Sequence, residues 1–123
     1  MKIRSFKIFV NQNNDVDIWI KGLSVKARAR LDAIIRHMEI TKDWTRTPYF
    51  SPLTGYSGIC EIKFIVQNKQ YRPLGCYGPE ENEYTILIGA YEIGNRFEPL
   101  NAPQMALARR LEILEGRGRT VEY

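Results

Sequence analysis

The chain has 123 residues, of which 44% are hydrophobic and 26% are charged, and its formal net charge is +4. This composition is typical of one globular domain, here spanning 1–123, and it excludes collagen-like and intrinsically disordered proteins. No apolar run approaches the ~18 residues that span a bilayer, and the first residues lack the apolar stretch of a secretory signal. We therefore expect a cytoplasmic protein with no membrane partner.

Positive charge is concentrated in the N-terminal third of the chain. Residues 1–48 hold ten Lys and Arg against five acidic residues, whereas residues 58–98 hold four against six. The basic region fits an anionic partner such as RNA, DNA or an acidic protein, and it fits plain solubility equally well. One histidine and two cysteines are too few for a structural zinc site, which takes about four such ligands. We expect neither a metal nor a cofactor.

The first elements in chain order are a strand and a short helix. Apolar residues among polar ones predict a strand over 3–10, and the polar run 11–14 predicts a turn. Asn14 is placed to cap a helix over 15–21, which Gly22 would end in a left-handed conformation. The residues expected to face the core from this helix are Ile18 and Trp19.

A second helix follows Ser24, a favourable N-cap residue. Apolar residues recur on one helical face, namely Ala27, Leu31, Ile34, Ile35 and Met38. The opposite face carries Lys26, Arg28, Arg30, Arg36 and His37. Because the connection is short, the two helices are expected to form an antiparallel helical hairpin.

Residues 41–57 contain two prolines and no helical period, so they predict a loop. A connection of this length is either functional or anchored to the rest of the fold. Its aromatic residues favour anchoring to the core: Trp44, Tyr49, Phe50 and Tyr56.

Three strand-like runs follow at 58–67, 70–77 and 84–91, the first two joined by a turn centred on 68–69. Consecutive strands joined by short turns form an antiparallel meander. Pro73 cannot donate a ladder hydrogen bond, so it predicts a bulge or an unpaired side within the second run.

The last predicted element is a helix that Asn101 caps and that reaches Glu115. Its apolar stripe is expected to consist of Met105, Ala108, Leu111 and Leu114. Residues 117–123 are expected to form a loose tail. The predicted fold class is α+β: an N-terminal strand, a helical hairpin, an antiparallel β-meander and a C-terminal helix.

Alternation along the first strand of the meander sorts its side chains into two faces. The apolar set should face the helices and comprises Cys60, Ile62, Phe64 and Val66. Glu61 and Lys63 must then point the other way, and the expected turn places Arg72 on their face. That face is either a working surface or a set of solvated polar residues.

The same register predicts two free thiols. Cys60 and Cys76 would lie on opposite faces and could not form a disulfide, whose Cβ atoms must approach to about 4 Å. A turn of three residues would instead bring them face to face, so the prediction depends on one residue of register.

Five short motifs occur in a recognisable order. They are Pro52-Leu53-Thr54-Gly55, Ile59-Cys60-Glu61-Ile62-Lys63, Tyr71-Arg72, Ile86-Leu87-Ile88-Gly89-Ala90-Tyr91 and Ala108-Arg109-Arg110. With the order of elements, they make the chain similar to the RelE/ParE toxin superfamily, above all to its HigB-like, phage-derived branch. The likeness covers about residues 3–112. It implies a RelE-like fold and the toxin of a type II toxin–antitoxin pair, with a cognate antitoxin protein as partner.

The resemblance also implies an activity, ribosome-dependent endoribonuclease cleavage of mRNA without a metal. A ribose 2′-hydroxyl attacks the adjoining phosphate, and the protein must stabilise the growing charge and move protons. Matching by motif gives the catalytic candidates Arg72, Lys63 and Glu61, with Arg96 as the next nearby base. Tyr91 falls at an aromatic position of the family and would stack on an RNA base.

The chain departs from the family pattern at two places. Glu92-Ile93-Gly94-Asn95 follow the aromatic residue where the HigB-like branch usually carries a Lys-Lys pair, and Ser51 stands where lysine is common. The net charge of residues 58–98 is also negative. These features favour an alternative, a RelE/ParE-fold protein without nuclease activity that acts as a binding module or a gyrase-type inhibitor.

Four further kinds of residue have competing interpretations. The arginines of the second helix, Arg28, Arg30 and Arg36, form either an RNA-binding surface or an ordinary solvated face. His37 on the same face is expected to be solvated rather than catalytic. Cys76 has no histidine near it in sequence that would make a catalytic pair, and Tyr123 is the last aromatic residue.

Overall fold

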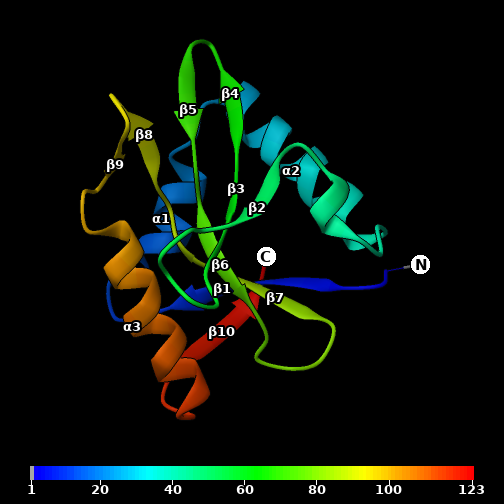
Figure 1. Cartoon of the computed structure of the whole chain (residues 1–123), viewed down its shortest axis with the longest axis vertical. Helices are drawn as coiled ribbons and strands as arrows, with labels where there is room; N and C mark the ends of the chain where they lie inside the picture. The colour runs from blue at the N-terminus through cyan, green and yellow to red at the C-terminus, as the bar shows by residue number, and fades with distance from the viewer. Residues whose placement is uncertain (1) are drawn as a thin grey trace.

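The computed structural model describes residues 2–123, which leaves Met1 outside the description, and it contains a large and a small β-sheet with three α-helices (Figure 1). The large sheet has the strand order β10-β1-β7-β6-β3-β2 and the small sheet β4-β5-β8-β9. The helices are α1 (Asp15–Lys21), α2 (Val25–Glu39) and α3 (Ala102–Leu114), with a 3₁₀ turn η1 (Trp44–Arg46).

The strands of the large sheet are β1 (Ser5–Val10), β2 (Phe50–Pro52), β3 (Cys60–Ile62), β6 (Leu74–Tyr77), β7 (Glu83–Ile88) and β10 (Arg119–Glu122). Those of the small sheet are β4 (Phe64–Val66), β5 (Lys69–Tyr71), β8 (Tyr91–Ile93) and β9 (Arg96–Glu98). The predicted α+β layout is confirmed, because an N-terminal strand, two helices, an antiparallel meander and a C-terminal helix occur in that order.

β1 lies inside the large sheet, parallel to β7 and antiparallel to β10. The prediction of a loose tail over 117–123 was therefore wrong. β10 pairs with β1, and the Tyr123 amide donates a hydrogen bond to the Phe6 carbonyl at 3.1 Å. Alternation in the short segment Arg119–Glu122 gave too weak a signal, because only Val121 is strongly apolar.

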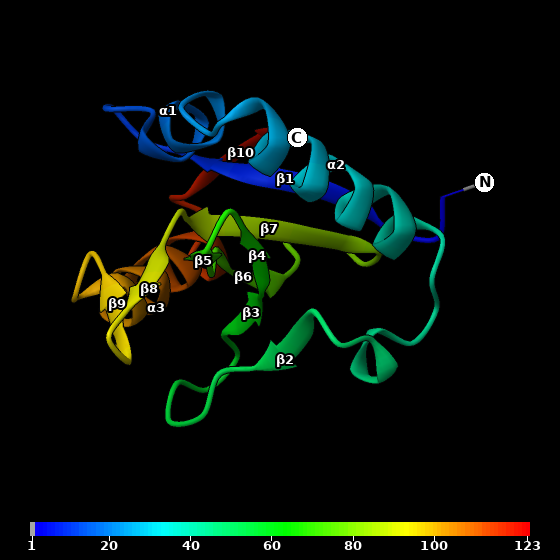
Figure 2. The same ribbon diagram turned by 90° about the horizontal axis from the view of Figure 1, so that it is seen from above.

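Helices α1 and α2 lie on one side of β1 and β7, and α3 lies on the other (Figure 2). The Ser24 cap of α2 is confirmed, since its Oγ accepts a hydrogen bond from the Ala27 amide at 3.2 Å. The predicted apolar face of α2 is also confirmed, and all of its residues are buried: Ala27, Leu31, Ile34, Ile35 and Met38.

Three expectations about α1 were wrong. Gly22 is right-handed with φ −82°, because the chain turns directly into the next helix instead of reversing. Asn14 makes no side-chain cap, and the Asn11 side chain accepts from the Asp15 amide instead. Ile18 points to solvent, while the core-facing residues are Val16 and Ile20.

The segment 41–57 is anchored as predicted, but it is not a plain loop. It contains η1 and strand β2, which adds to the edge of the large sheet by pairing with β3. Trp44 and Phe50 are buried in an aromatic cluster with Tyr84, whose side chain is fully enclosed.

The three meander strands are each interrupted at about the same level. β3 gives way to β4 at Lys63, β5 to β6 at Arg72 and Pro73, and β7 to β8 at Gly89 and Ala90. The predicted irregularity at Pro73 is confirmed. Three long strands thus become two sheets, and the β4–β5 hairpin projects from the molecule (Figure 1).

The hairpin turn lies one residue earlier than expected. Gln67 and Asn68 form it, both with positive φ, and pair Phe64 with Tyr71. The register therefore differs by two residues from the predicted one. A shift by an even number leaves each side chain on its predicted face, so Lys63 now lies directly opposite Arg72.

The predicted apolar stripe of α3 was wrong. Leu111 and Leu114 are 52% and 64% exposed, whereas the buried face consists of Ala102, Pro103, Ala106 and Arg109. Arg109 is buried because it makes hydrogen bonds with Asp15 and with the Leu87 carbonyl. Small side chains let the helix approach the sheet, and a paired arginine completes the contact.

Cys60 and Cys76 are free and buried, as the register predicted. Within residues 2–123, no helix is both long and apolar enough to cross a membrane.

Candidate anion-binding pocket

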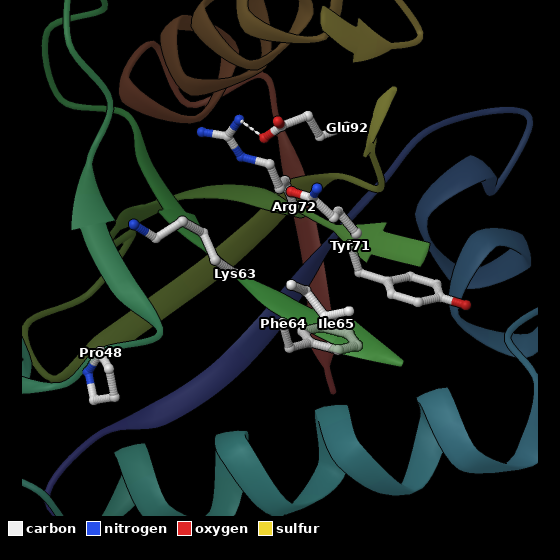
Figure 3. Close-up of a pocket in the computed structure, with 8 residues that line it drawn as sticks. Pro48, Lys63, Phe64, Ile65, Tyr71, Arg72 and Glu92 are labelled. Atoms are coloured by element: carbon white, nitrogen blue, oxygen red, sulfur yellow. Dashed lines mark hydrogen bonds and ion pairs between the residues drawn. The ribbon is translucent and has the colours of Figure 1, made fainter. Parts of the chain in front are cut away.

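A pocket of about 380 Å³ opens where the meander strands are interrupted (Figure 3). Its walls are Pro48, Lys63, Phe64, Ile65, Gln70, Tyr71, Arg72 and Glu92. The pocket thus gathers side chains from the segment before β2, from both strands of the β4–β5 hairpin and from β8. Two of the predicted catalytic residues, Lys63 and Arg72, line it together.

Arg72 is held on three sides. Its Nη2 donates to Glu61 Oε2 at 2.5 Å, and its Nη1 donates to Glu92 Oε1. The guanidinium carbon also lies 4.8 Å from the centre of the Phe97 ring. Because two carboxylates and a ring fix the guanidinium, its position is set before any ligand arrives.

Glu61 lies beneath the pocket rather than in its wall. The residue is only 5% exposed, and its carboxylate also accepts a hydrogen bond from Ser51 Oγ at 3.2 Å. Strand pairing explains this contact, since Ser51 lies opposite Glu61 in the β2–β3 ladder. Glu61 is thus enclosed, and its role in the structure is to hold Arg72.

Lys63 is the more available cation of the pocket. Its side chain is 43% exposed, and its Nζ lies 3.8 Å from Glu61 Oε1, which is a loose ion pair. Its backbone is fixed, because the Lys63 amide donates to the Tyr49 carbonyl at 2.8 Å. An ammonium with spare donors on a fixed strand is suited to holding an anion.

Glu92 is the pocket residue that sequence reasoning missed. The third meander strand was expected to end at Tyr91, so Glu92 counted only as a departure from a family pattern. In the structure the chain resumes as β8 after the interruption, and Glu92 pairs with Gln70 across the small sheet. Extending the alternation by one residue would have placed it on the Arg72 face.

Arg96 and Tyr91 do not join the pocket. Arg96 is exposed in the β8–β9 hairpin, where it lies opposite Ile93. The ring of Tyr91 packs against Tyr71 and against Trp19 of α1, and Lys69 Nζ lies 3.9 Å from its centre. Tyr91 is thus part of an aromatic cluster that ties the small sheet to α1.

The arginines of α2 lie apart from the pocket walls and are split between two sides of the helix. Arg28 pairs with Asp32 and lies over the Tyr123 ring, whose hydroxyl donates to the same aspartate. Arg36 lines a separate cavity of about 140 Å³ that also includes Asp32 and Tyr123. These contacts give Tyr123 a structural role at the β10 edge.

Arg30 lies on the other side of α2, near Tyr49. Burial raises the pKa of Tyr49, and the charge of Arg30 opposes that rise. The exposed ring of His37 is hydrogen-bonded to the Tyr49 hydroxyl. His37 is therefore exposed, as expected, and it also has a specific partner.

Burial raises the pKa of both thiols, Cys60 and Cys76, to about 11. A thiol in this state is a poor nucleophile at neutral pH. Neither cysteine lines the pocket. Cys76 thus has no reactive setting.

Within residues 2–123, no group of three or more His, Cys, Asp and Glu side chains is arranged to hold a metal ion. Comparisons with protein-family models, with curated proteins and with solved structures found no match for this chain.

The pocket combines two cations with one accessible carboxylate and apolar walls. An oxyanion could take hydrogen bonds from Lys63 and Arg72, while Glu92 could accept a proton or a hydrogen bond from the same ligand. Pro48, Phe64 and Ile65 offer apolar surface of the kind on which a base or ring can rest. Phosphate esters of nucleosides carry both of these features.

Proposed function

We propose that the chain is a toxin of the RelE/ParE type that binds RNA in this pocket and cleaves it as a metal-independent, ribosome-dependent mRNA endoribonuclease. The observation that carries the proposal is the placement of Lys63 opposite Arg72, with both lining one pocket. The order of elements expected from the resemblance supports it as well.

In the proposed reaction, the 2′-hydroxyl oxygen of one ribose forms a bond to the adjoining phosphorus, and the bond to the 5′-oxygen of the next nucleotide breaks. The products are a 2′,3′-cyclic phosphate and a free 5′-hydroxyl. Lys63 and Arg72 stabilise the charge that grows on the phosphate. Glu92 is the carboxylate placed to take the 2′-hydroxyl proton.

The test is cleavage of a defined mRNA on purified ribosomes. Lys63→Met should reduce the rate by about 100-fold, the typical effect of removing one group that stabilises transition-state charge. Lys69→Met is the matched control, because Lys69 lies in the same hairpin but over Tyr91. Equal loss in both variants, or no cleavage by the wild type, would contradict the assignment.

Induced expression provides a second readout. The wild-type protein should arrest growth and degrade messages, and Lys63→Met should do neither at equal expression. A toxin of this type should also retain its activity in excess EDTA. A cognate antitoxin, supplied in the same cell, should restore growth.

The pairing of Arg72 supports a second candidate function, a binding module or gyrase-type inhibitor with no nuclease activity. Both terminal nitrogens of Arg72 already contact carboxylates, so the formal charges of Glu61, Lys63, Arg72 and Glu92 cancel. This candidate predicts inhibition of gyrase supercoiling, or capture of a partner, that persists in Lys63→Met while RNA stays intact throughout.

A further inference from the structure

Arg72 carries more negative partners than one positive charge can balance. Glu61 and Glu92 bind its two terminal nitrogens, and Lys63 is the only other cation lining the pocket. A phosphate therefore cannot gain the full attraction of Arg72 while both carboxylates remain in place. One of the two must give way when an anion binds.

The surroundings of the two carboxylates identify which one can move. Glu61 is enclosed, with a side chain 6% exposed, and Ser51 and Lys63 hold it in addition to Arg72. Glu92 is more exposed, at 19%, lines the pocket itself and has Arg72 as its ion-pair partner. Its strand is short and leads into the Gly94–Asn95 turn. Moving Glu92 therefore exposes no buried charge.

We propose that Glu92 is a replaceable counter-ion, and that a phosphate group of the ligand takes its place on Arg72. The inference rests on the proposed function, since it concerns the same pocket, and it specifies how that pocket accepts its ligand. After the exchange, Arg72 and Lys63 face the phosphate over one buried carboxylate, Glu61. The local charge then changes from zero to one positive charge.

The bonding of Arg72 is also incomplete in the resting state. Its Nε is buried and has no hydrogen-bond partner. A buried donor without an acceptor is costly, and a guanidinium has five donors. A phosphate, with several acceptor oxygens, can satisfy more of these donors than a single carboxylate oxygen does.

The exchange also explains how a proton acceptor becomes available. While Glu92 is paired with Arg72, its basicity is reduced by the adjacent positive charge. Release by the incoming phosphate frees the carboxylate beside that phosphate. Binding and activation of the base would then be one event.

The experiment is a titration of inorganic phosphate followed by backbone amide NMR shifts, at constant ionic strength. Glu92→Gln should bind phosphate about fivefold more tightly than wild type, the size expected from removing one partly exposed competing charge. Lys63→Met in the Glu92→Gln background should reverse the gain. Shifts should be largest at Lys63, Gln70 and Arg72.

Glu98→Gln is the matched control, because it removes the same charge from an exposed site in the neighbouring strand β9. Glu92→Asp is the second variant, which keeps the charge but shortens the reach to Arg72, and it should also bind phosphate more tightly. The inference is overturned if neither folded Glu92 variant exceeds Glu98→Gln in phosphate affinity.

A parallel titration with a short single-stranded RNA separates this inference from the proposed function. Tighter phosphate binding by Glu92→Gln, without RNA cleavage by any form on the ribosome, would support the anion site and reject the nuclease. Cleavage by the wild type with unchanged phosphate affinity in the variants would reject the exchange and retain the nuclease. A gain for phosphate but not for RNA would identify a site for free phosphate.

Discussion

Arg72 stabilises the fold as well as shaping the pocket, because it neutralises the enclosed carboxylate of Glu61. Arg72→Ala leaves that charge with Ser51 and a loose contact to Lys63. We expect the free energy of unfolding to fall by about 2–3 kcal/mol in urea denaturation. Arg96→Ala, which removes an exposed arginine, should change it by less than about 0.5 kcal/mol. Equal stability of the two variants would show that Glu61 does not depend on Arg72.

The two buried thiols predict a loss of stability in alkaline solution. Their pKa values rise from 9.0 to about 11 on folding, so the folded state keeps its protons while the unfolded state loses them. Below pH 9 both states are protonated and stability is unaffected. Above it, each thiol should lower the free energy of unfolding by about 1.4 kcal/mol per pH unit until the folded pKa is reached.

Urea denaturation at pH 8, 9 and 10 checks this prediction. A variant with both Cys60→Ala and Cys76→Ala should lose less stability between pH 9 and pH 10 than the wild type does. An identical slope in the two proteins would assign the alkaline effect to other groups, such as the buried Tyr84, whose pKa burial also raises.

The pocket was only partly predictable from sequence, for a reason found in single residues. Lys63 and Arg72 could be placed on one face because alternation survives an even shift of register. Glu61 was on the same face, but nothing in the alternation shows that β2 and Ser51 would cover it. Glu92 lay beyond an interruption at Gly89 and Ala90 that no local signal announces.

The joint between β7 and β8 depends on close contact with α1. A Cβ added at Gly89 would lie 2.0 Å from Trp19 Cδ2, so a side chain cannot fit unless the indole moves. Gly89→Ala should lower the free energy of unfolding by about 2 kcal/mol or more. Gly22→Ala is the control, since Gly22 has an ordinary right-handed φ and its nearest contact is 3.2 Å. Thermal unfolding of both variants measures the difference.

Strand β10 makes a prediction about hydrogen exchange. The Tyr123 amide donates to the Phe6 carbonyl inside the sheet, so it should be protected from exchange with solvent. The exposed turn at Asn95 should exchange rapidly under the same conditions. Exchange of the Tyr123 amide as fast as that of Asn95 would mean that the tail is loose after all.

The elements themselves were largely predictable, and their faces were less so. The face of α2 could be identified because its buried side chains are large and regularly spaced. α3 misled because its larger apolar residues, Leu111 and Leu114, point outward while alanines contact the sheet. Hydrophobic periodicity measures the size of an apolar stripe, whereas close helix packing favours small residues.

The distribution of arginines over the whole molecule predicts the salt dependence of RNA binding. If RNA contacts only the pocket cations Lys63 and Arg72, the logarithm of affinity should fall with the logarithm of salt concentration with a slope of about −1.4. Contacts from Arg28, Arg30 and Arg36 as well would steepen the slope to about −3.5. Titrations across salt concentrations therefore measure whether α2 takes part in binding.

The place of β1 within the large sheet has a consequence for biosynthesis. The ribosome makes this strand among the first residues, yet its two neighbours in the sheet, β7 and β10, emerge much later. Until then the nascent chain presents Phe6, Ile8 and Phe9 without their native cover. Such long-range pairing slows folding and prolongs the exposure of sticky surface. Synthesis rate and chaperone supply should therefore strongly affect the yield of native protein.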